Sequence, residues 1–248
     1  PTLGADIAIL VLLMKMFPTK LREVVIYYFA SPIIIYASYM HSQLDLLPMA
    51  VLLFSVHSLT SGRLLHSAIA LGLAASIKFH VVAALPLMMV YIWKNHRRSR
   101  LFSFISIPAL VYLFFAFPYL MSDGYINMVL KNPKQMMLYD VFYAIGELKI
   151  YLPLVAVLAV YSRFIAYSRI NNDLFFSFLG ILFSTFVLLI FPSPAWYIWM
   201  TPFLSMFFID YSAKSPKILF LFIALNGLYL IYFIFFHIPD HPDLSFLG

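Results

Sequence analysis

Long apolar runs separated by short charged clusters dominate this sequence. Each run is bounded by charged residues, prolines or glycines, and each is close to the length that an apolar helix needs to cross a membrane. The expected segments are 3–17, 24–40, 44–60, 64–77, 80–93, 101–121, 150–167, 174–191, 196–211 and 218–237. The pattern predicts an all-α fold, a polytopic membrane bundle of about 10 transmembrane segments, some of them short, that forms one membrane domain over residues 1–248.

Residues 64–93 admit two topologies, either one long helix or a hairpin that turns at residues 78–80. If the chain turns there and the basic loop 94–100 is cytoplasmic, the cytoplasmic loops hold 12 of the 16 lysines and arginines. Basic residues collect in cytoplasmic loops of membrane proteins, and a lysine in mid-membrane costs a few kcal/mol or more. We therefore expect a hairpin whose turn lies at the extracytoplasmic surface.

The longest segment between expected spans covers residues 122–149. Its many apolar residues and the break at Asn132-Pro133 predict an extracytoplasmic loop that contains interfacial amphipathic helices.

Composition agrees with a membrane protein. The chain is 64% hydrophobic and only 10% charged, whereas an average soluble domain has about 25% charged residues. Cysteine is absent, which excludes disulfides, zinc ribbons and thiol nucleophiles. The net charge of +6 is explained by basic cytoplasmic loops, so nucleic acid is not an expected partner. Because the chain has no glycine-rich phosphate loop, a nucleotide cofactor is not expected either.

Polar residues at the expected extracytoplasmic ends are the candidates for chemistry. His41, Gln43 and Asp45 open the third segment, where a carboxylate and an imidazole could bind a cation, orient a sugar hydroxyl or move a proton. The alternative for Asp45 is a helix cap. Lys78 and His80 at the hairpin turn form a candidate phosphate site, and the alternative is a lysine that reaches toward lipid headgroups.

Two further candidates are weaker. Trp196 and Tyr197 follow a proline-rich turn and could stack on a sugar or isoprenoid unit, although aromatic residues also gather at membrane interfaces. Asp6 near the outer end of the first segment could line a cavity or cap the helix. For a catalytic acid or base the sequence offers only two candidates, Asp45 and Asp6, and both are weak. No metal site is predicted, although a divalent metal is compatible with these carboxylates.

Four motifs occur in the order found in one known class of membrane enzyme. They are Gly4-Ala-Asp-Ile-Ala-Ile-Leu10, Ser31-Pro through His41-Ser-Gln-Leu-Asp45, Ala70-Leu-Gly-Leu-Ala-Ala-Ser-Ile-Lys78 followed by Pro86, and Pro194-Ala-Trp-Tyr-Ile-Trp-Met-Thr-Pro202. On these motifs the chain resembles the GT-C class of glycosyltransferases, in the branch of mannosyl- and glucosyltransferases that use polyprenyl-phosphate-linked sugars.

The resemblance implies a GT-C-like fold and sugar transfer from a polyprenyl- or dolichyl-phosphate donor to a sugar, protein or lipid acceptor at the extracytoplasmic or lumenal face. Lys78 and His80 would stabilise the departing phosphate, His41, Gln43 and Asp45 would hold hydroxyl groups, and Trp196 and Tyr197 would line the cavity. No organic cofactor is implied. The membrane would be the bacterial plasma membrane or the endoplasmic reticulum.

One part of the family pattern has no counterpart here. The catalytic acid of the family lies in a large extracytoplasmic loop before the span that corresponds to the Asp6 segment. The resemblance therefore predicts that this loop precedes Pro1, or that the chain is a non-catalytic subunit that needs a partner. A third interpretation is a transporter or flippase for lipid-linked saccharides, although the chain shows no pair of related halves.

Overall fold

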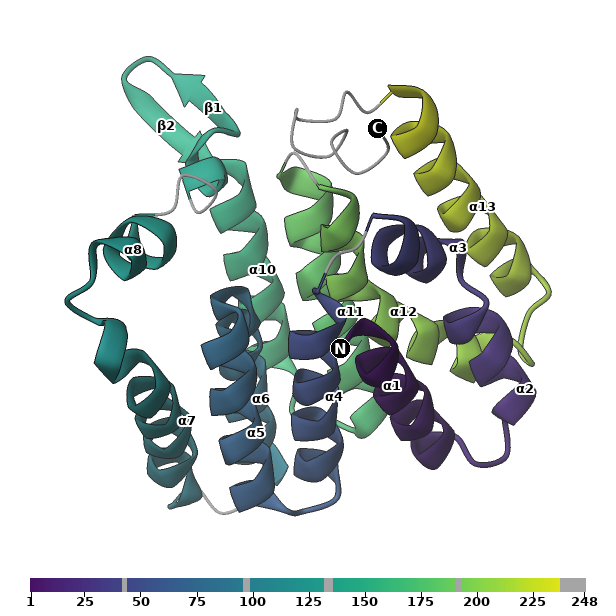
Figure 1. Cartoon of the computed structure of the whole chain (residues 1–248). Coiled ribbons are helices and arrows are strands. Elements are labelled where there is room, and N and C mark those ends of the chain that lie inside the picture. The colour runs from purple at the N-terminus through teal and green to yellow at the C-terminus, as the bar shows by residue number, and fades with distance from the viewer. Residues whose placement is uncertain (42–43, 96–98, 132–135, 191–192, 237–248) are drawn as a thin grey trace.

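The computed structural model describes residues 1–41, 44–95, 99–131, 136–190 and 193–236, and shows a bundle of helices with one small β-hairpin (Figure 1). The α-helices are α1 (Thr2–Met16), α2 (Leu21–Val24), α3 (Pro32–Ile34), α4 (Leu46–Thr60), α5 (Leu64–Ile77), α6 (Leu85–Asn95), α7 (Arg100–Ala116), α8 (Asp123–Tyr125), α10 (Leu152–Ala166), α11 (Asn172–Leu189), α12 (Tyr197–Tyr211) and α13 (Lys217–Ile231). Short 3₁₀ and π segments are η1 (Val25–Phe29), η2 (Ile35–Met40), η3 (Phe79–Ala84), η4 (Phe117–Tyr119), η5 (Ile126–Leu130), η6 (Met137–Tyr139), η7 (Pro194–Trp196) and η8 (Tyr232–Phe236), and the strands are β1 (Phe142–Ile145) and β2 (Leu148–Tyr151).

Each of the expected apolar segments contains a helix, so the prediction of a helical bundle is confirmed. Among the described residues, three helices are long and apolar enough to cross a membrane, namely Arg100–Tyr119, Asn172–Leu189 and Lys217–Phe235. A bent pair formed by Leu21–Phe29 and Pro32–Met40 makes a fourth if it is one span. Four further apolar helices are shorter. Several long apolar helices thus mark a membrane-embedded protein, whereas the number of about ten spans stays a prediction.

The chain reverses direction between α5 and α6, as the hairpin prediction requires. Helix α5 ends at Ile77, and Lys78 adopts an extended conformation before η3. Gly62, just before α5, and Asn95, at the end of α6, line one cavity together. Since the start of α5 and the end of α6 share one end of the bundle, the two helices are antiparallel, and the alternative of one continuous helix is wrong.

Most lysine and arginine residues lie toward one end of the bundle. We call the end that holds Gly62 and Asn95 the basic end, and the opposite end the Lys78 end. An ion pair of 2.9 Å between Lys20 and Asp210 joins the α1–α2 turn to the last turn of α12. The helix bounds place Lys15, Lys20, Arg22, Arg63, Lys94, Arg100, Arg163, Arg169, Lys214 and Lys217 toward the basic end, and Lys78, Lys131 and Lys149 toward the other.

The bent pair has an identifiable cause. Pro32 has no amide hydrogen to donate and its ring prevents the preceding helix from continuing, so the two halves meet at an angle of 44°. The Asn226 carboxamide oxygen on α13 accepts hydrogen bonds from the Ser31 hydroxyl (2.8 Å) and the Ile33 amide (3.2 Å). A side chain from the last helix therefore satisfies polar groups that the break would otherwise leave unpaired inside the bundle.

The loop over residues 122–149 differs from the expectation of interfacial helices. Short helical segments are present at 123–130 and 137–139, but β1 and β2 pair as an antiparallel hairpin. Five of the eight strand residues are aromatic or β-branched, types that favour strands, and Gly146 at the turn has φ of +61°, a conformation that favours glycine. The expectation of helix is therefore wrong for residues 142–151, where the residue types favour strands.

Helices α5 and α7 approach each other closely at Gly72. A Cβ atom added to Gly72 would lie 2.8 Å from the carbonyl oxygen and 2.9 Å from the Cα atom of Pro108. Backbone atoms cannot move aside as the end of a flexible side chain can. Gly72 is thus the position that sets the distance between these two helices.

The Gly72→Ala variant is expected to unfold at lower denaturant concentration, with a loss of about 1–3 kcal/mol because of overpacking. The matched control is Gly227→Ala in α13, where an added Cβ meets no atom within 4 Å. There the change is expected to be neutral or to stabilise by about 0.5–1 kcal/mol through helix propensity. Denaturant titration of the detergent-solubilised protein, followed by circular dichroism, measures both, and equal effects would contradict the close contact.

The predicted sidedness can be tested by thiol labelling, since the chain has no cysteine. A cysteine at Phe79, which is 49% exposed, should react with a membrane-impermeant maleimide added from the extracytoplasmic side. A cysteine at Ser61 at the basic end should react only from the cytoplasmic side. The reverse pattern in oriented membranes would invert the topology.

Candidate functional site

An ion pair between the Asp45 carboxylate and the Lys78 ammonium lies at the Lys78 end of the bundle. Asp45 precedes α4 and Lys78 follows α5, and the ammonium donates a hydrogen bond to Asp45 Oδ1. The Asp45 side chain is 1% exposed, whereas that of Lys78 is 41% exposed. Asp45 occupies the N-cap position of α4, as the cap alternative expects, but its side chain makes no capping hydrogen bond. The pair places one charge inside the protein and leaves part of its partner accessible.

A stack of aromatic rings forms one wall beside this ion pair. The His80 ring lies 3.9 Å from the Trp199 ring at an interplanar angle of 15°, and the Trp196 ring stacks on Trp199 at 5.0 Å. The Lys78 Nζ atom lies 5.4 Å from the centroid of the Trp199 ring, within the range of a cation–π contact. Residues from three of the predicted motifs, namely Asp45, the Lys78 and His80 pair, and Trp196, therefore belong to one cluster.

Trp199 is the member of this cluster that the sequence prediction missed. It lies at the centre of the stack, between His80 and Trp196. A usable signal was present, because residues three apart on a helix share a face and Trp199 follows Trp196 by three positions. We call Asp45, Lys78, His80, Trp196 and Trp199 the Lys78 cluster.

Several polar atoms of the Lys78 cluster are buried without a hydrogen-bond partner among the described residues. They are both ring nitrogens of His80, Asp45 Oδ2 and Trp199 Nε1. A buried polar atom without a partner costs about 1–3 kcal/mol, and folded proteins contain only a few. Four such atoms in one cluster indicate a binding site, in which hydrogen-bond partners come from outside the described residues.

The other predicted site residues are placed differently. His41 is half-buried at the end of η2, and its amide donates to the Tyr36 carbonyl. Gln43 lies outside the described residues. The Tyr197 ring packs against Tyr229 at 4.8 Å and Phe233 at 5.4 Å. Tyr197 thus belongs to an aromatic contact between α12 and the end of the bundle formed by α13 and η8, and its expected place beside the Lys78 cluster is not seen.

Asp6 is buried and fully engaged. The Tyr28 hydroxyl donates to Asp6 Oδ1 at 2.8 Å, and the Tyr39 hydroxyl donates to Oδ2 at 2.6 Å. Both tyrosines belong to the bent pair, so the carboxylate ties α1 to both halves of it. Because both carboxylate oxygens already accept a hydrogen bond, the contacts favour a structural role over that of a catalytic base.

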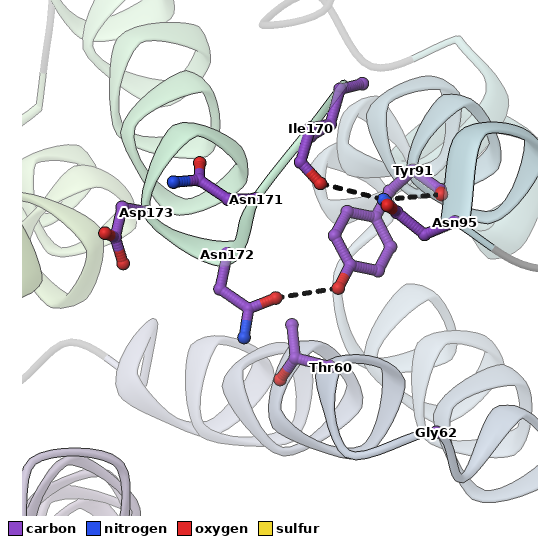
Figure 2. A pocket seen from close by; sticks show the side chains of 8 residues that line it. All are labelled: Thr60, Gly62, Tyr91, Asn95, Ile170, Asn171, Asn172 and Asp173. Atoms are coloured by element: carbon purple, nitrogen blue, oxygen red, sulfur yellow. Dashed lines mark hydrogen bonds between the residues drawn. The ribbon is translucent and has the colours of Figure 1, made fainter.

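A second polar region lies at the basic end (Figure 2). An open cavity of about 570 Å³ is lined by Thr60, Gly62, Tyr91, Asn95, Ile170, Asn171, Asn172 and Asp173. The Tyr91 hydroxyl donates to Asn172 Oδ1 at 2.7 Å, and Asn95 Nδ2 donates to the Ile170 carbonyl at 2.9 Å. Asn171 caps α11 through the Leu174 amide. These bonds hold α6 against the start of α11, so the region fastens helices together.

No protein-family model, no curated protein and no solved structure matches this chain. Within the part of the chain that the structure describes, no three His, Asp or Glu side chains come close enough to hold a metal ion. The fold and the charge distribution define an α-helical membrane-embedded protein with a candidate polar site at the Lys78 end.

A double-mutant cycle can measure the ion pair. Lys78→Met leaves the buried Asp45 carboxylate unpaired, and we expect a loss of about 2 kcal/mol, below the roughly 3–5 kcal/mol of a fully buried pair because Lys78 is partly exposed. Asp45→Asn should cost about 1 kcal/mol, and the double variant should be no less stable than Lys78→Met alone.

Denaturant unfolding in detergent measures all three variants. Lys149→Met serves as the control, since Lys149 is exposed and its recorded contact is with the Phe142 ring at 4.7 Å. Additive effects of the two site changes would show that Lys78 and Asp45 do not interact.

Proposed function

We propose that this protein is a membrane glycosyltransferase, or the membrane core of one, that uses a polyprenyl-phosphate-linked sugar. The observation that carries the proposal is the Lys78 cluster, in which a partly exposed ammonium, a buried carboxylate and an aromatic stack meet at one end of an apolar bundle. An anionic lipid headgroup at the bilayer surface needs such a cation, and a donor anchored in lipid needs no nucleotide-binding loop.

The proposed reaction is an inverting transfer. An acceptor hydroxyl attacks C1 of the sugar, the bond from C1 to the lipid phosphate oxygen breaks, and the phosphate leaves with the electron pair. The hydroxyl proton passes to a carboxylate base. Lys78 neutralises charge that develops on the leaving phosphate, where a positioned cation has most effect.

The ring nitrogens of His80 and the Nε1 hydrogen of Trp199 are buried, so the substrate would reach them once its binding opens the Lys78 cluster. Trp199 Nε1 is a donor only, and a neutral imidazole offers one donor and one acceptor. Phosphate oxygens and sugar hydroxyls match both kinds of group. Contacts of this kind would satisfy polar atoms that are otherwise buried without a partner.

The contacts rank the two candidate carboxylates. Both oxygens of Asp6 accept tyrosine hydroxyls, whereas Asp45 keeps Oδ2 without a donor. Asp45 is therefore the better candidate to hold a sugar or acceptor hydroxyl. Its other oxygen is held by Lys78, so Asp45 could take a proton on Oδ2 alone, and a base from a preceding loop or a partner subunit fits the proposal equally.

The test is sugar transfer by the full-length protein in liposomes, with polyprenyl-phosphate mannose and polyprenyl-phosphate glucose as donors and a membrane extract as acceptor. His80→Phe keeps a ring on Trp199 but removes both ring nitrogens, so we expect transfer to fall at least about 100-fold, with stability unchanged or higher. Lys78→Met should abolish transfer. Chromatography of the labelled lipid and product measures the rate.

Lys149→Met is the control and should keep normal activity. Normal transfer by His80→Phe and Lys78→Met would remove the Lys78 cluster from the reaction. Movement of the intact donor across the bilayer without any transfer product would instead identify a flippase.

A further inference from the structure

The β-hairpin at the Lys78 end has two chemically different faces, which its register defines. Phe142 pairs with Tyr151, Tyr143 with Ile150, Ala144 with Lys149, and Ile145 with Leu148. Side chains alternate between the faces of a strand, so Tyr143, Ile145, Leu148 and Ile150 share one face. We call this the Tyr143 face. The opposite face carries Phe142, Ala144, Lys149 and Tyr151.

The Tyr143 face is apolar and uncovered. Tyr143, Ile145 and Leu148 are 62%, 57% and 61% exposed, and Ile150 is half-buried. On the other face, the Lys149 ammonium lies 4.7 Å from the Phe142 ring, and the rings of Tyr139 and Tyr151 contact each other at 5.2 Å. The Lys149 charge and these ring contacts thus lie on the face away from Tyr143, and the other charged residue of the hairpin, Glu147, lies at the turn.

The length of α10 indicates what covers the Tyr143 face. The hairpin runs directly into α10, with Tyr151 ending β2 and Leu152 beginning the helix, and projects beyond that helix in Figure 1. Helix α10 has 15 residues, or about 22 Å of length, whereas a hydrocarbon core is about 30 Å thick. If α10 crosses the membrane, the residues that precede it lie at the depth of the lipid interface.

The surface of α10 continues the same apolar character. Leu152, Val155 and Leu158 are 41%, 50% and 63% exposed. A protein partner fits less well, because a stable interface takes roughly 20–30 residues from each side and the Tyr143 face offers four. A two-stranded hairpin is also only marginally stable in water, and an interface that covers one apolar face would stabilise it.

We infer that the hairpin is a membrane-interface anchor. Its Tyr143 face lies among the lipid headgroups and upper acyl chains beside α10, and its Lys149 face is directed to water and to lipid phosphates. The strand edges stay at the hydrated boundary, because unpaired backbone groups are not tolerated in hydrocarbon. The proposal depends on the membrane character of the bundle and is independent of any sugar transfer.

The absence of cysteine allows a direct test by spin labelling. Single cysteines replace Tyr143 and Leu148 on the apolar face, and Ala144 and Lys149 on the other face. Each variant carries a nitroxide and is reconstituted in vesicles of phosphatidylcholine and phosphatidylglycerol. Power saturation measures collision with oxygen, which concentrates in lipid, and with a water-soluble nickel complex.

The ratio of oxygen to nickel accessibility should be severalfold higher at 143 and 148 than at 144 and 149. High nickel accessibility on both faces would overturn the inference, since the hairpin would then stand in water. Protection of 143 and 148 from both reagents would also overturn it, because protein would then cover this face. Two sites on each face keep the result readable if one variant fails to fold.

Discussion

The cost of placing a lysine in hydrocarbon governs the centre of this structure. Lys78 interrupts a stretch that is otherwise apolar, and the chain turns back there instead of continuing as one helix. Its ammonium reaches the buried carboxylate of Asp45, which brings the start of α4 to the end of α5. The same turn delivers His80 to the face of Trp199. One ion pair thus fixes the reversal of the chain and assembles the polar cluster.

The apolar runs predicted where helices form, because a helix that must be buried or meet lipid needs continuous apolar sequence. The distribution of lysine and arginine also predicted the reversal at Lys78. The hairpin at 142–151 was missed, since its strands have four residues each and the surrounding segment is rich in methionine and leucine. The proline at position 32 was a sequence signal for the kink. The hydrogen bond from Ser31 to Asn226 was not predictable, because Asn226 lies far along the chain.

Residue chemistry singled out Asp45, the pair of Lys78 and His80, and Trp196 as three candidates, but no local pattern revealed that the three meet. Their association arises from packing between α4, η3 and α12. Only its helical spacing from Trp196 could have predicted Trp199 as a member of the cluster. The two tyrosines that donate hydrogen bonds to Asp6 lie on opposite sides of the kink, and sequence spacing gives no means to predict that geometry. Side-chain identity thus predicts which residues are candidates for chemistry. Tertiary contacts then decide which carboxylate keeps an oxygen atom without a hydrogen-bond donor.

The contact between Ser31 and Asn226 has a consequence for biogenesis. The amide and hydroxyl groups at the kink belong to residues 33 and 31, whereas the carboxamide that accepts their hydrogen bonds belongs to α13, which is synthesised later. Before α13 enters the membrane, those groups lack the Asn226 carboxamide as a partner. A chain truncated before Asn226 would therefore leave the kink without this contact.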